Sequence, residues 1–113
     1  HLGVDGNGRI ILSQDPPENG LKPAISYLFR SVARSFGRNA VGVLLTGMGK
    51  DGAEELKQLR RQGGLTMVQN EESSVVFGMP GEALNLGAAD HVLAPEEIAG
   101  SLVRLFAREA IRG

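Results

Sequence analysis

The stretch VGVLLTGMGKDGAEEL, residues 41–56, runs from an apolar segment through a glycine-rich loop into a helix-like pattern. Residues 41–46 are apolar on both faces, which is typical of a strand buried in a parallel sheet. A loop with three glycines follows at 47–52, and a helix is predicted from about Ala53 to Gln62. This strand–loop–helix unit indicates an α/β protein.

The segments on either side continue this alternation. Upstream, HLGV and RIILS flank the turn Asp5-Gly6-Asn7-Gly8 and predict a β-hairpin. The other predicted elements are a helix opened by Pro23 and ending at Phe36, strands at 65–69 and 90–94, a short strand or extended piece at 75–78, a helix at 80–86 and a helix from Pro95. We therefore expect one α/β domain, 1–113, that is part of a doubly wound, mostly parallel, three-layer αβα sheet of Rossmann type with an N-terminal hairpin.

The composition excludes several classes of function. A net charge of −1 gives no basic surplus for binding nucleic acid or an anionic membrane surface. The absence of cysteine rules out disulfides and thiolate metal sites, and it fits a reducing compartment. No apolar run approaches the roughly 18 residues of a transmembrane helix. Because the sequence opens inside a predicted strand, we expect a piece of a longer protein.

The glycine loop has three interpretations, and the first is dinucleotide binding. Gly47, Gly49 and Gly52 match G-x-G-x-x-G between a strand and a helix. Glu71 follows about twenty residues later, where a ribose-binding acid belongs. Against this, the carboxylate of Asp51 would repel a pyrophosphate at the helix N-terminus. A hairpin and a long helix also precede the loop, whereas a fingerprint loop normally follows the first strand of its domain.

The second and third interpretations concern Asp51. Asp51-Gly52-Ala53-Glu54 has the spacing of a capping box, in which Asp51 accepts backbone N–H groups and Glu54 reaches back. Alternatively, Asp51 lies beyond the carboxyl end of a strand, where open α/β sheets bind ligands. An ionised, oriented Asp is what a Ser-His-Asp triad needs behind its His. One oxygen can cap while the other faces a His, so these two interpretations are compatible.

The chain shows no evident nucleophile or base for such a triad. His1 flanks the hairpin, and His91 lies near the start of a predicted strand, where we expect a structural role. No Ser stands in G-x-S-x-G or another glycine-flanked elbow. If the chemistry is hydrolytic, the nucleophile and the base come from elsewhere.

Longer motifs extend well beyond the glycine loop. They are PPENGLKPAISYLFRSVA (16–33), LTGMGKDGA (45–53), QNEESSVVFGMPGEA (69–83) and GAADHVLAPEEIA (87–99). Together they resemble the C-terminal half of the catalytic domain of the chemotaxis protein-glutamate methylesterases, over nearly the whole chain. The resemblance implies a doubly wound serine esterase that removes methyl groups from glutamate methyl esters on chemoreceptors. Many members of the family also deamidate particular receptor glutamines.

The resemblance also assigns site residues. The triad Asp of the family falls on Asp51, whereas its Ser and His lie in an N-terminal half that this sequence lacks. His1 matches a His that is not the triad base. The GMG backbone makes the Met48 N–H a candidate oxyanion donor. The residues expected to form the oxyanion site or line the cleft are Met48, Gly49, Met79 and Pro80. No metal or organic cofactor is implied.

The implied partners are the cytoplasmic helices of methylated chemoreceptors, so we expect a cytoplasmic protein without membrane insertion or nucleic acid. The family often carries a receiver domain upstream. It usually has a basic residue where this chain has Gly81, so recognition of an acidic receptor segment is expected to differ if that residue contributes to it.

The 113-residue chain alone is expected to be inactive. Half of a doubly wound sheet exposes a strand edge, so we expect either an oligomer that covers this edge or a species left by proteolysis of a longer protein. A Rossmann-type nucleotide-binding module and a non-catalytic interaction domain stay open as alternatives.

Overall fold

The computed structural model describes residues 1–112, with side chains through residue 108. β1 (Leu2–Val4) and β2 (Ile10–Leu12) form the predicted antiparallel hairpin. The other elements are α1 (Ile25–Phe36), the 3₁₀ turn η1 (Gly37–Asn39), β3 (Val41–Leu44), α2 (Ala53–Arg61), β4 (Leu65–Gln69), α3 (Met79–Asn85), β5 (His91–Leu93) and α4 (Pro95–Arg112). The predicted order of helices and strands is confirmed.

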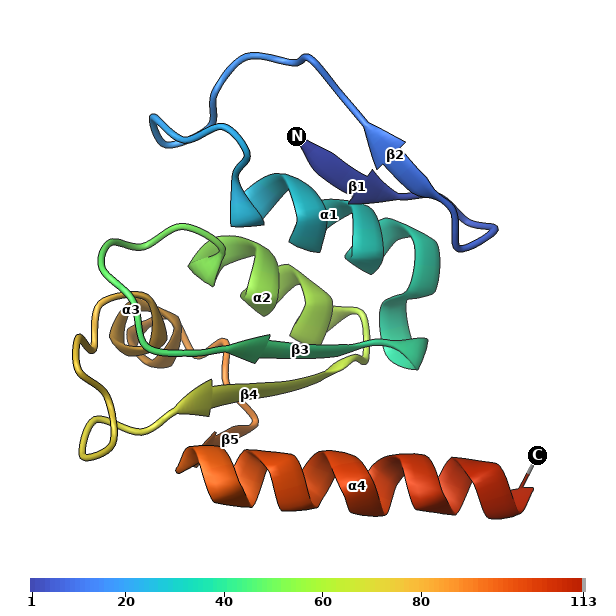
Figure 1. Cartoon of the computed structure of the whole chain (residues 1–113), viewed down its shortest axis with the longest axis vertical. Coiled ribbons are helices and arrows are strands. Elements are labelled where there is room, and N and C mark those ends of the chain that lie inside the picture. The colour runs from blue at the N-terminus through green and yellow to red at the C-terminus, as the bar shows by residue number, and fades with distance from the viewer. Residues whose placement is uncertain (113) are drawn as a thin grey trace.

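β3, β4 and β5 form a parallel sheet in that order. Val43 pairs with Met67, and Met67 pairs with His91, so the carboxyl ends of the three strands lie at one edge. Figure 1 shows α1 and α2 on one side of the sheet and α4 on the other. This is the three-layer arrangement expected from the alternating elements.

The hydrophobic core lies between the sheet and the helices α1, α2 and α3. Its buried members are Ala33, Leu44, Ala53, Leu56, Leu59, Val68, Ala83 and Ala88. Gly42 of β3 lets α2 approach the sheet closely. A Cβ at this position would lie 2.6 Å from Cδ1 of Leu56 and 2.9 Å from Cδ2 of Leu59. The missing side chain therefore sets how closely the two leucines pack on β3.

The hairpin packs on α1 and does not join the parallel sheet. The Val4 N–H donates to Oγ of Ser31 at 3.0 Å, and Oγ of Ser35 donates to the Val4 carbonyl at 3.2 Å. The ring of His1 stacks on Tyr27 with centroids 4.7 Å apart. α1 is therefore held between the hairpin and α2, as Figure 1 shows.

Two boundaries differ from the sequence prediction by two residues, and those of α2, α3 and β5 differ by one. α1 begins at Ile25 and not at Pro23, because Ala24 is extended (φ −112°, ψ 140°) and its N–H binds the His1 ring. β3 ends at Leu44, because the Thr46 N–H leaves the ladder and donates to Oε1 of Gln69. Residues 75–78, predicted as a short strand or extended piece, form an extended segment with one parallel bridge, between Gly47 and Phe77.

Candidate functional site

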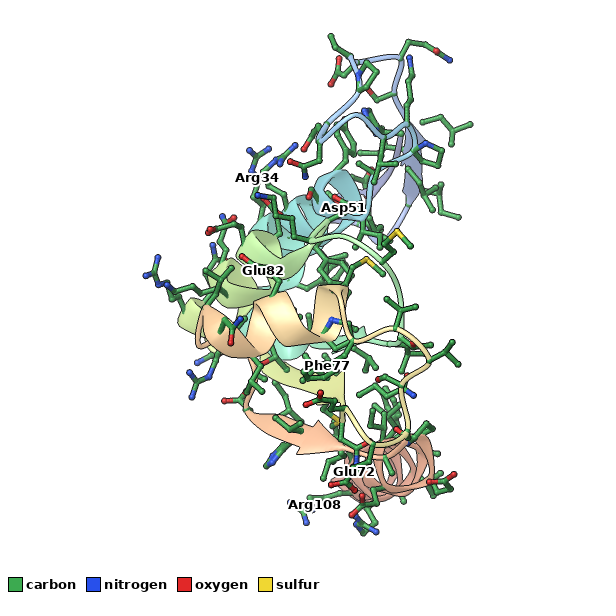
Figure 2. The ribbon with its side chains drawn as sticks, turned by 90° about the vertical axis from the view of Figure 1, so that its left-hand side faces the viewer. Arg34, Asp51, Glu72, Phe77, Glu82 and Arg108 are labelled. Carbon is green, nitrogen blue, oxygen red and sulfur yellow. The ribbon has the colours of Figure 1, made fainter. Side chains whose placement is uncertain are left out.

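The predicted site lies at the carboxyl edge of the sheet, where three segments meet. They are the loop 45–52 after β3, the segment 70–78 after β4 and the N-terminus of α1. Figure 2 shows Asp51 beside the first turn of α1, with Phe77 before α3. Side chains and backbone groups that are far apart in sequence therefore come together at this edge.

Asp51 is only 4% exposed, and its carboxylate faces the N-terminus of α1. Oδ2 accepts the Ile25 N–H at 2.6 Å. Oδ1 accepts the Ser26 hydroxyl at 2.6 Å, the Ser26 N–H at 3.2 Å and the Asn19 side-chain amide at 3.3 Å. The first N–H groups of a helix have no partner within the helix, and the helix dipole favours negative charge there. A carboxylate fits this position.

The capping-box prediction for Asp51 is wrong about which helix is capped. α2 has no side-chain cap, and its N-cap residue is Gly52, whose N–H donates to Oγ of Ser26 at 3.2 Å. Gly52 has φ 88°, and a Cβ there would lie 2.6 Å from Cγ2 of Ile25. Only glycine fits this turn readily. The turn directs Asp51 to α1, so the carboxylate caps the helix that precedes it in the chain.

The hydrogen bonds determine the charge of Asp51. Burial alone raises the pKa of this carboxyl, but bonds from Ser26, Ile25 and Asn19 outweigh burial and hold the pKa below its ordinary value. Asp51 is therefore ionised at neutral pH. Oδ1 has three donors, whereas Oδ2 has one, so Oδ2 retains capacity to accept another N–H.

The start of α2 is a poor cradle for a pyrophosphate. A dinucleotide fingerprint uses free N–H groups at the start of the helix that follows the glycine loop. Here the Gly52 N–H binds Oγ of Ser26, and the Ala53 N–H donates to the Lys50 carbonyl at 3.3 Å. The N–H groups of Gly52 and Ala53 are therefore not free to bind a phosphate, which counts against the dinucleotide interpretation of the glycine loop.

The glycine loop is joined to the segment before α3 by backbone contacts. The Gly47 carbonyl accepts the N–H groups of Gly78 at 3.1 Å and Met79 at 3.0 Å, and the Gly47 N–H donates to the Val76 carbonyl at 3.0 Å. A Cβ on Gly78 would lie 2.6 Å from the Gly47 oxygen and 2.9 Å from the Gly49 nitrogen. The two loops therefore form one rigid unit.

The four other predicted site residues lie in this unit or in the first turn of α3 beside it. Met48 is 83% exposed, and within residues 1–112 no hydrogen-bond acceptor is found for its N–H. Gly49 has φ 90°, in the left-handed region. Met79 begins α3, and Pro80 is buried in the first turn of this helix. The structure thus brings all four to the carboxyl edge that also holds Asp51.

Gly81 faces the ring of Phe77. A Cβ on Gly81 would lie 2.9 Å from Cδ2 and 3.1 Å from Cε2 of this ring. The aromatic ring therefore occupies the space next to α3 that the first carbon of a longer side chain would need.

Neither histidine of the chain contacts Asp51. Nδ1 of His1 accepts the Ala24 N–H at 3.1 Å, so Nε2 carries the proton and donates to the Pro16 carbonyl at 2.8 Å. Both ring nitrogens of His1 are thus engaged. His91 is the first residue of β5, at the amino edge of the sheet and opposite to Asp51. Within the described residues, Asp51 has no imidazole partner.

The sequence did not identify Ser26 and Asn19 as members of the site. Ser26 stands in the first turn of a helix and Asn19 in a loop, where both residue types are common for local reasons. They lie 25 and 32 residues from Asp51 in the chain. No local pattern connects positions so far apart.

Two absences concern residues 1–112 alone. None of the helices there combines the length and the hydropathy needed to cross a bilayer. Among residues 1–108, whose side chains the structure describes, no three His, Asp or Glu side chains gather closely enough to hold a metal ion.

Comparison with known proteins identifies the family. The sequence profile described as CheB methylesterase matches residues 1–102. The chain belongs to the CheB methylesterase family.

Similar proteins are named for two activities, protein-glutamate methylesterase and protein-glutamine glutaminase. The protein-glutamate methylesterase/protein-glutamine glutaminase 1 of Syntrophus aciditrophicus (strain SB) is 62% identical over 105 residues, which are 93% of this chain and 30% of that protein. The protein of the same name with number 4 from Geobacter metallireducens is 58% identical over 106 residues, with the same coverage. The chain thus spans about 30% of the length of these curated relatives.

A solved structure supports the fold. The crystal structure of the Thermotoga maritima CheB methylesterase catalytic domain matches with a TM-score of 0.87 at 33% identity. The match covers 93% of this chain and 57% of that chain. The α/β fold is therefore shown by the structure and by this likeness together.

Proposed function

We propose that this chain supplies the acid of a Ser-His-Asp triad that hydrolyses glutamate methyl esters on chemoreceptors and deamidates receptor glutamines. The observation that carries the proposal is the Asp51 carboxylate. It is buried, ionised and bound to the N-terminus of α1, and Oδ2 has a single protein donor. Two relatives named for these activities, at 62% and 58% identity, support the choice of reaction.

In this proposal Oδ2 of Asp51 accepts an N–H of the catalytic imidazole, which belongs with the nucleophilic Ser to a part of the domain outside this chain. The carboxylate fixes the tautomer and orientation of the imidazole and stabilises the imidazolium. The imidazole takes the proton of the Ser hydroxyl as the Ser oxygen attacks the ester carbonyl. The imidazolium then returns the proton to the departing methanol, and water releases the glutamate in the second half of the reaction.

In this proposal the joined loops supply the oxyanion site. We assign the Met48 N–H as a donor to the oxygen that becomes negative, because Met48 is exposed and its N–H has no acceptor within residues 1–112. An oxyanion donor is effective when it is preorganised. The contact of Gly78 with Gly47 and Gly49 provides the rigidity. Gly49, Met79 and Pro80 form the adjoining wall of the cleft in this proposal.

Residues 1–113 form the C-terminal portion of a single methylesterase catalytic domain in this proposal, with methylated receptor helices in the cytoplasm as substrates. The matched segment is 57% of the solved catalytic domain but only 30% of the relatives. These relatives are therefore longer than a catalytic domain, which supports a further domain, such as a receiver, in the parent protein.

The test uses the complete protein encoded by the gene and a methylated receptor as substrate. Asp51→Asn should lower kcat by about 10⁴-fold with a small change in KM, because an amide cannot hold the imidazole in the required tautomer. Asp15→Asn makes the same chemical change at an exposed position and should leave kcat unchanged. The 113-residue chain alone should release no methanol.

Three outcomes would contradict the proposal. Full activity of Asp51→Asn would leave Asp51 as a helix cap only. If the isolated chain hydrolyses the ester and Asp51→Ala abolishes this activity, the nucleophile and the base must lie within the chain itself. A rise of several degrees in the melting temperature with millimolar NAD, and none of the expected activity, would favour the nucleotide-binding alternative.

A further inference from the structure

We propose that Ser26 is a positioning residue of the triad, with Asn19 as a second donor, and that it fixes the plane of the Asp51 carboxylate so that Oδ2 faces the imidazole. The inference rests on the proposed function and extends it to a side chain that no triad motif contains. Ser26 is 2% exposed and lies in the first turn of α1.

The hydrogen bonds of Ser26 leave one choice for its proton. Its Oγ accepts the Gly52 N–H at 3.2 Å and lies 3.3 Å from the amide nitrogen of Asn19, which also donates. A hydroxyl has a single proton to donate. Because both neighbours are donors, this proton goes to Oδ1 of Asp51, at 2.6 Å. The hydroxyl is therefore oriented by its surroundings before any ligand binds.

The bond from the Ser26 hydroxyl makes the two oxygens of the Asp51 carboxylate differ in how many hydrogen bonds they accept. Oδ1 is held by the Ser26 hydroxyl, the Ser26 N–H and the Asn19 amide, whereas Oδ2 is held by the Ile25 N–H alone. The bond from the Ser26 hydroxyl is the shortest of the three hydrogen bonds to Oδ1. Without it Oδ1 keeps only contacts of 3.2 and 3.3 Å. The 2.6 Å bond from the Ile25 N–H to Oδ2 then lacks a short counterpart on Oδ1 that resists rotation about the Cβ–Cγ bond. Misplacement of a catalytic group by about 1 Å can cost a factor of about 100 in rate.

Ser26 also connects the starts of two helices, which is a structural role. It belongs to α1 and accepts the N–H of Gly52, the N-cap residue of α2. Loss of the hydroxyl is therefore expected to reduce stability as well. The test needs a measurement that reports on the carboxylate itself, and a variant that loses a comparable hydroxyl elsewhere on α1.

Ser31 offers the matched control. Its Oγ also makes two hydrogen bonds, donating to the Leu28 carbonyl at 2.7 Å and accepting the Val4 N–H at 3.0 Å. Ser31→Ala therefore removes a bonded hydroxyl from the same helix without touching Asp51. Ser26→Thr keeps the hydroxyl and serves as the conservative variant.

The first experiment follows the ¹³C chemical shift of the Asp51 carboxyl of the 113-residue chain during a pH titration. Other charged groups are close, since Lys50, Glu54 and Glu55 line a small pocket with Asn19. His1 also binds the neighbouring Ala24 N–H. The experiment therefore follows the carboxyl signal of Asp51 itself, which separates its titration from that of these neighbours. Ser26→Ala and, more weakly, Asn19→Ala should raise the pKa of Asp51, because each removes a donor to the ionised form. Ser31→Ala should leave it unchanged.

The second experiment measures kcat and KM of the complete enzyme. Ser26→Ala should lower kcat by about tenfold to a hundredfold with little change in KM, and Ser26→Thr should recover most of the loss. Equal losses in Ser26→Ala and Ser31→Ala, or an unchanged kcat in Ser26→Ala, would overturn the positioning role. If Ser26→Ala does not fold, Asn19→Ala supplies the same comparison with a smaller expected effect.

The outcomes separate this inference from the proposed function. If Asp51→Asn abolishes activity while Ser26→Ala and Asn19→Ala do not alter it, the triad stands and the positioning role fails. If Asp51→Asn is fully active, the proposed function fails and a change in the titration of Asp51 reports only on the cap of α1.

Discussion

The carboxylate of Asp51 caps α1, and it is the same carboxylate that we propose to be the acid of the triad. The N–H groups that start α1 keep its carboxylate ionised, and the same bonds fix its position. The structure places the cap on α1, whereas the sequence placed it on α2. A helix N-terminus that holds an acid is thus both a stabilising contact and a way to orient a potential catalytic group.

Replacement of Asp51 by Asn should also change stability with pH. At pH 7 we expect a loss of about 2–3 kcal/mol in the free energy of unfolding, because donors that face the carboxylate lose a charged acceptor. The folded-state pKa of Asp51 is lowered, so its contribution is present above the unfolded-state pKa, about 3.9, and is lost as pH falls through the folded-state value.

Urea unfolding of both proteins between pH 7 and pH 3 measures this effect. Asp90 also has a lowered pKa, because bonds from Arg60 and Thr66 outweigh its burial, so both proteins lose stability in acid. The difference between them isolates Asp51. This difference should shrink below about pH 4. A difference that stays constant over the whole range would show that Asp51 acts through its shape and not through its charge.

At the scale of the elements, the packing of α2 on β3 depends on one missing side chain. Gly42 lies under Leu56 and Leu59, both fully buried, and its absent Cβ is what lets them contact the strand. β3 and α2 flank the loop that carries Asp51. The distance between β3 and α2 therefore also sets how far apart the two ends of this loop lie in space.

Gly42→Ala should destabilise the chain by about 1–3 kcal/mol, because the added methyl group overlaps both leucine side chains. Leu56→Val removes one carbon near the new methyl and should relieve part of the strain. We therefore expect the double variant to lose less stability than the sum of the single variants in urea unfolding. Gly6→Ala is the control, since no heavy atom lies within 4 Å of its added Cβ. Strict additivity of Gly42→Ala and Leu56→Val would refute the contact.

At the scale of the whole molecule, open strand edges are the main feature. Within residues 1–112, β3 pairs only with β4, and the hairpin strand β2 pairs only with β1. Ile10 of β2 is 72% exposed and Leu12 is 78% exposed. Unpaired edges with apolar side chains promote pairing with another chain. The expected oligomer that covers a sheet edge remains a prediction.

We expect the isolated chain to self-associate through β3, with a sedimentation coefficient that rises with concentration. Val43→Lys places a charge on this edge strand and should give a monomer. Ile10→Lys makes a similar change on β2, and association should persist in this variant. Loss of association in Ile10→Lys alone would assign the contact to the hairpin. A wild-type chain that is monomeric at every concentration would contradict the prediction.

The sequence by itself determined the order of elements, the parallel sheet and the place of Asp51 at the carboxyl edge. These features follow from short-range patterns. Apolar runs such as 41–46 bury strands, and glycines such as Gly63 and Gly87 end helices. Asp51 lies in the short loop that joins β3 to α2, so its place at this edge needs no long-range information.

Only the tertiary structure decided what the Asp51 carboxylate contacts. The partners Ser26 and Asn19 are 25 and 32 residues away, and their residue types are common in turns and caps. The left-handed turn at Gly52 directs the carboxylate away from its own helix to α1. Hydrogen bonds between distant segments depend on how the helices pack, and packing is a property of the whole core. The sequence therefore predicted the acid, and the fold supplied the groups that orient it.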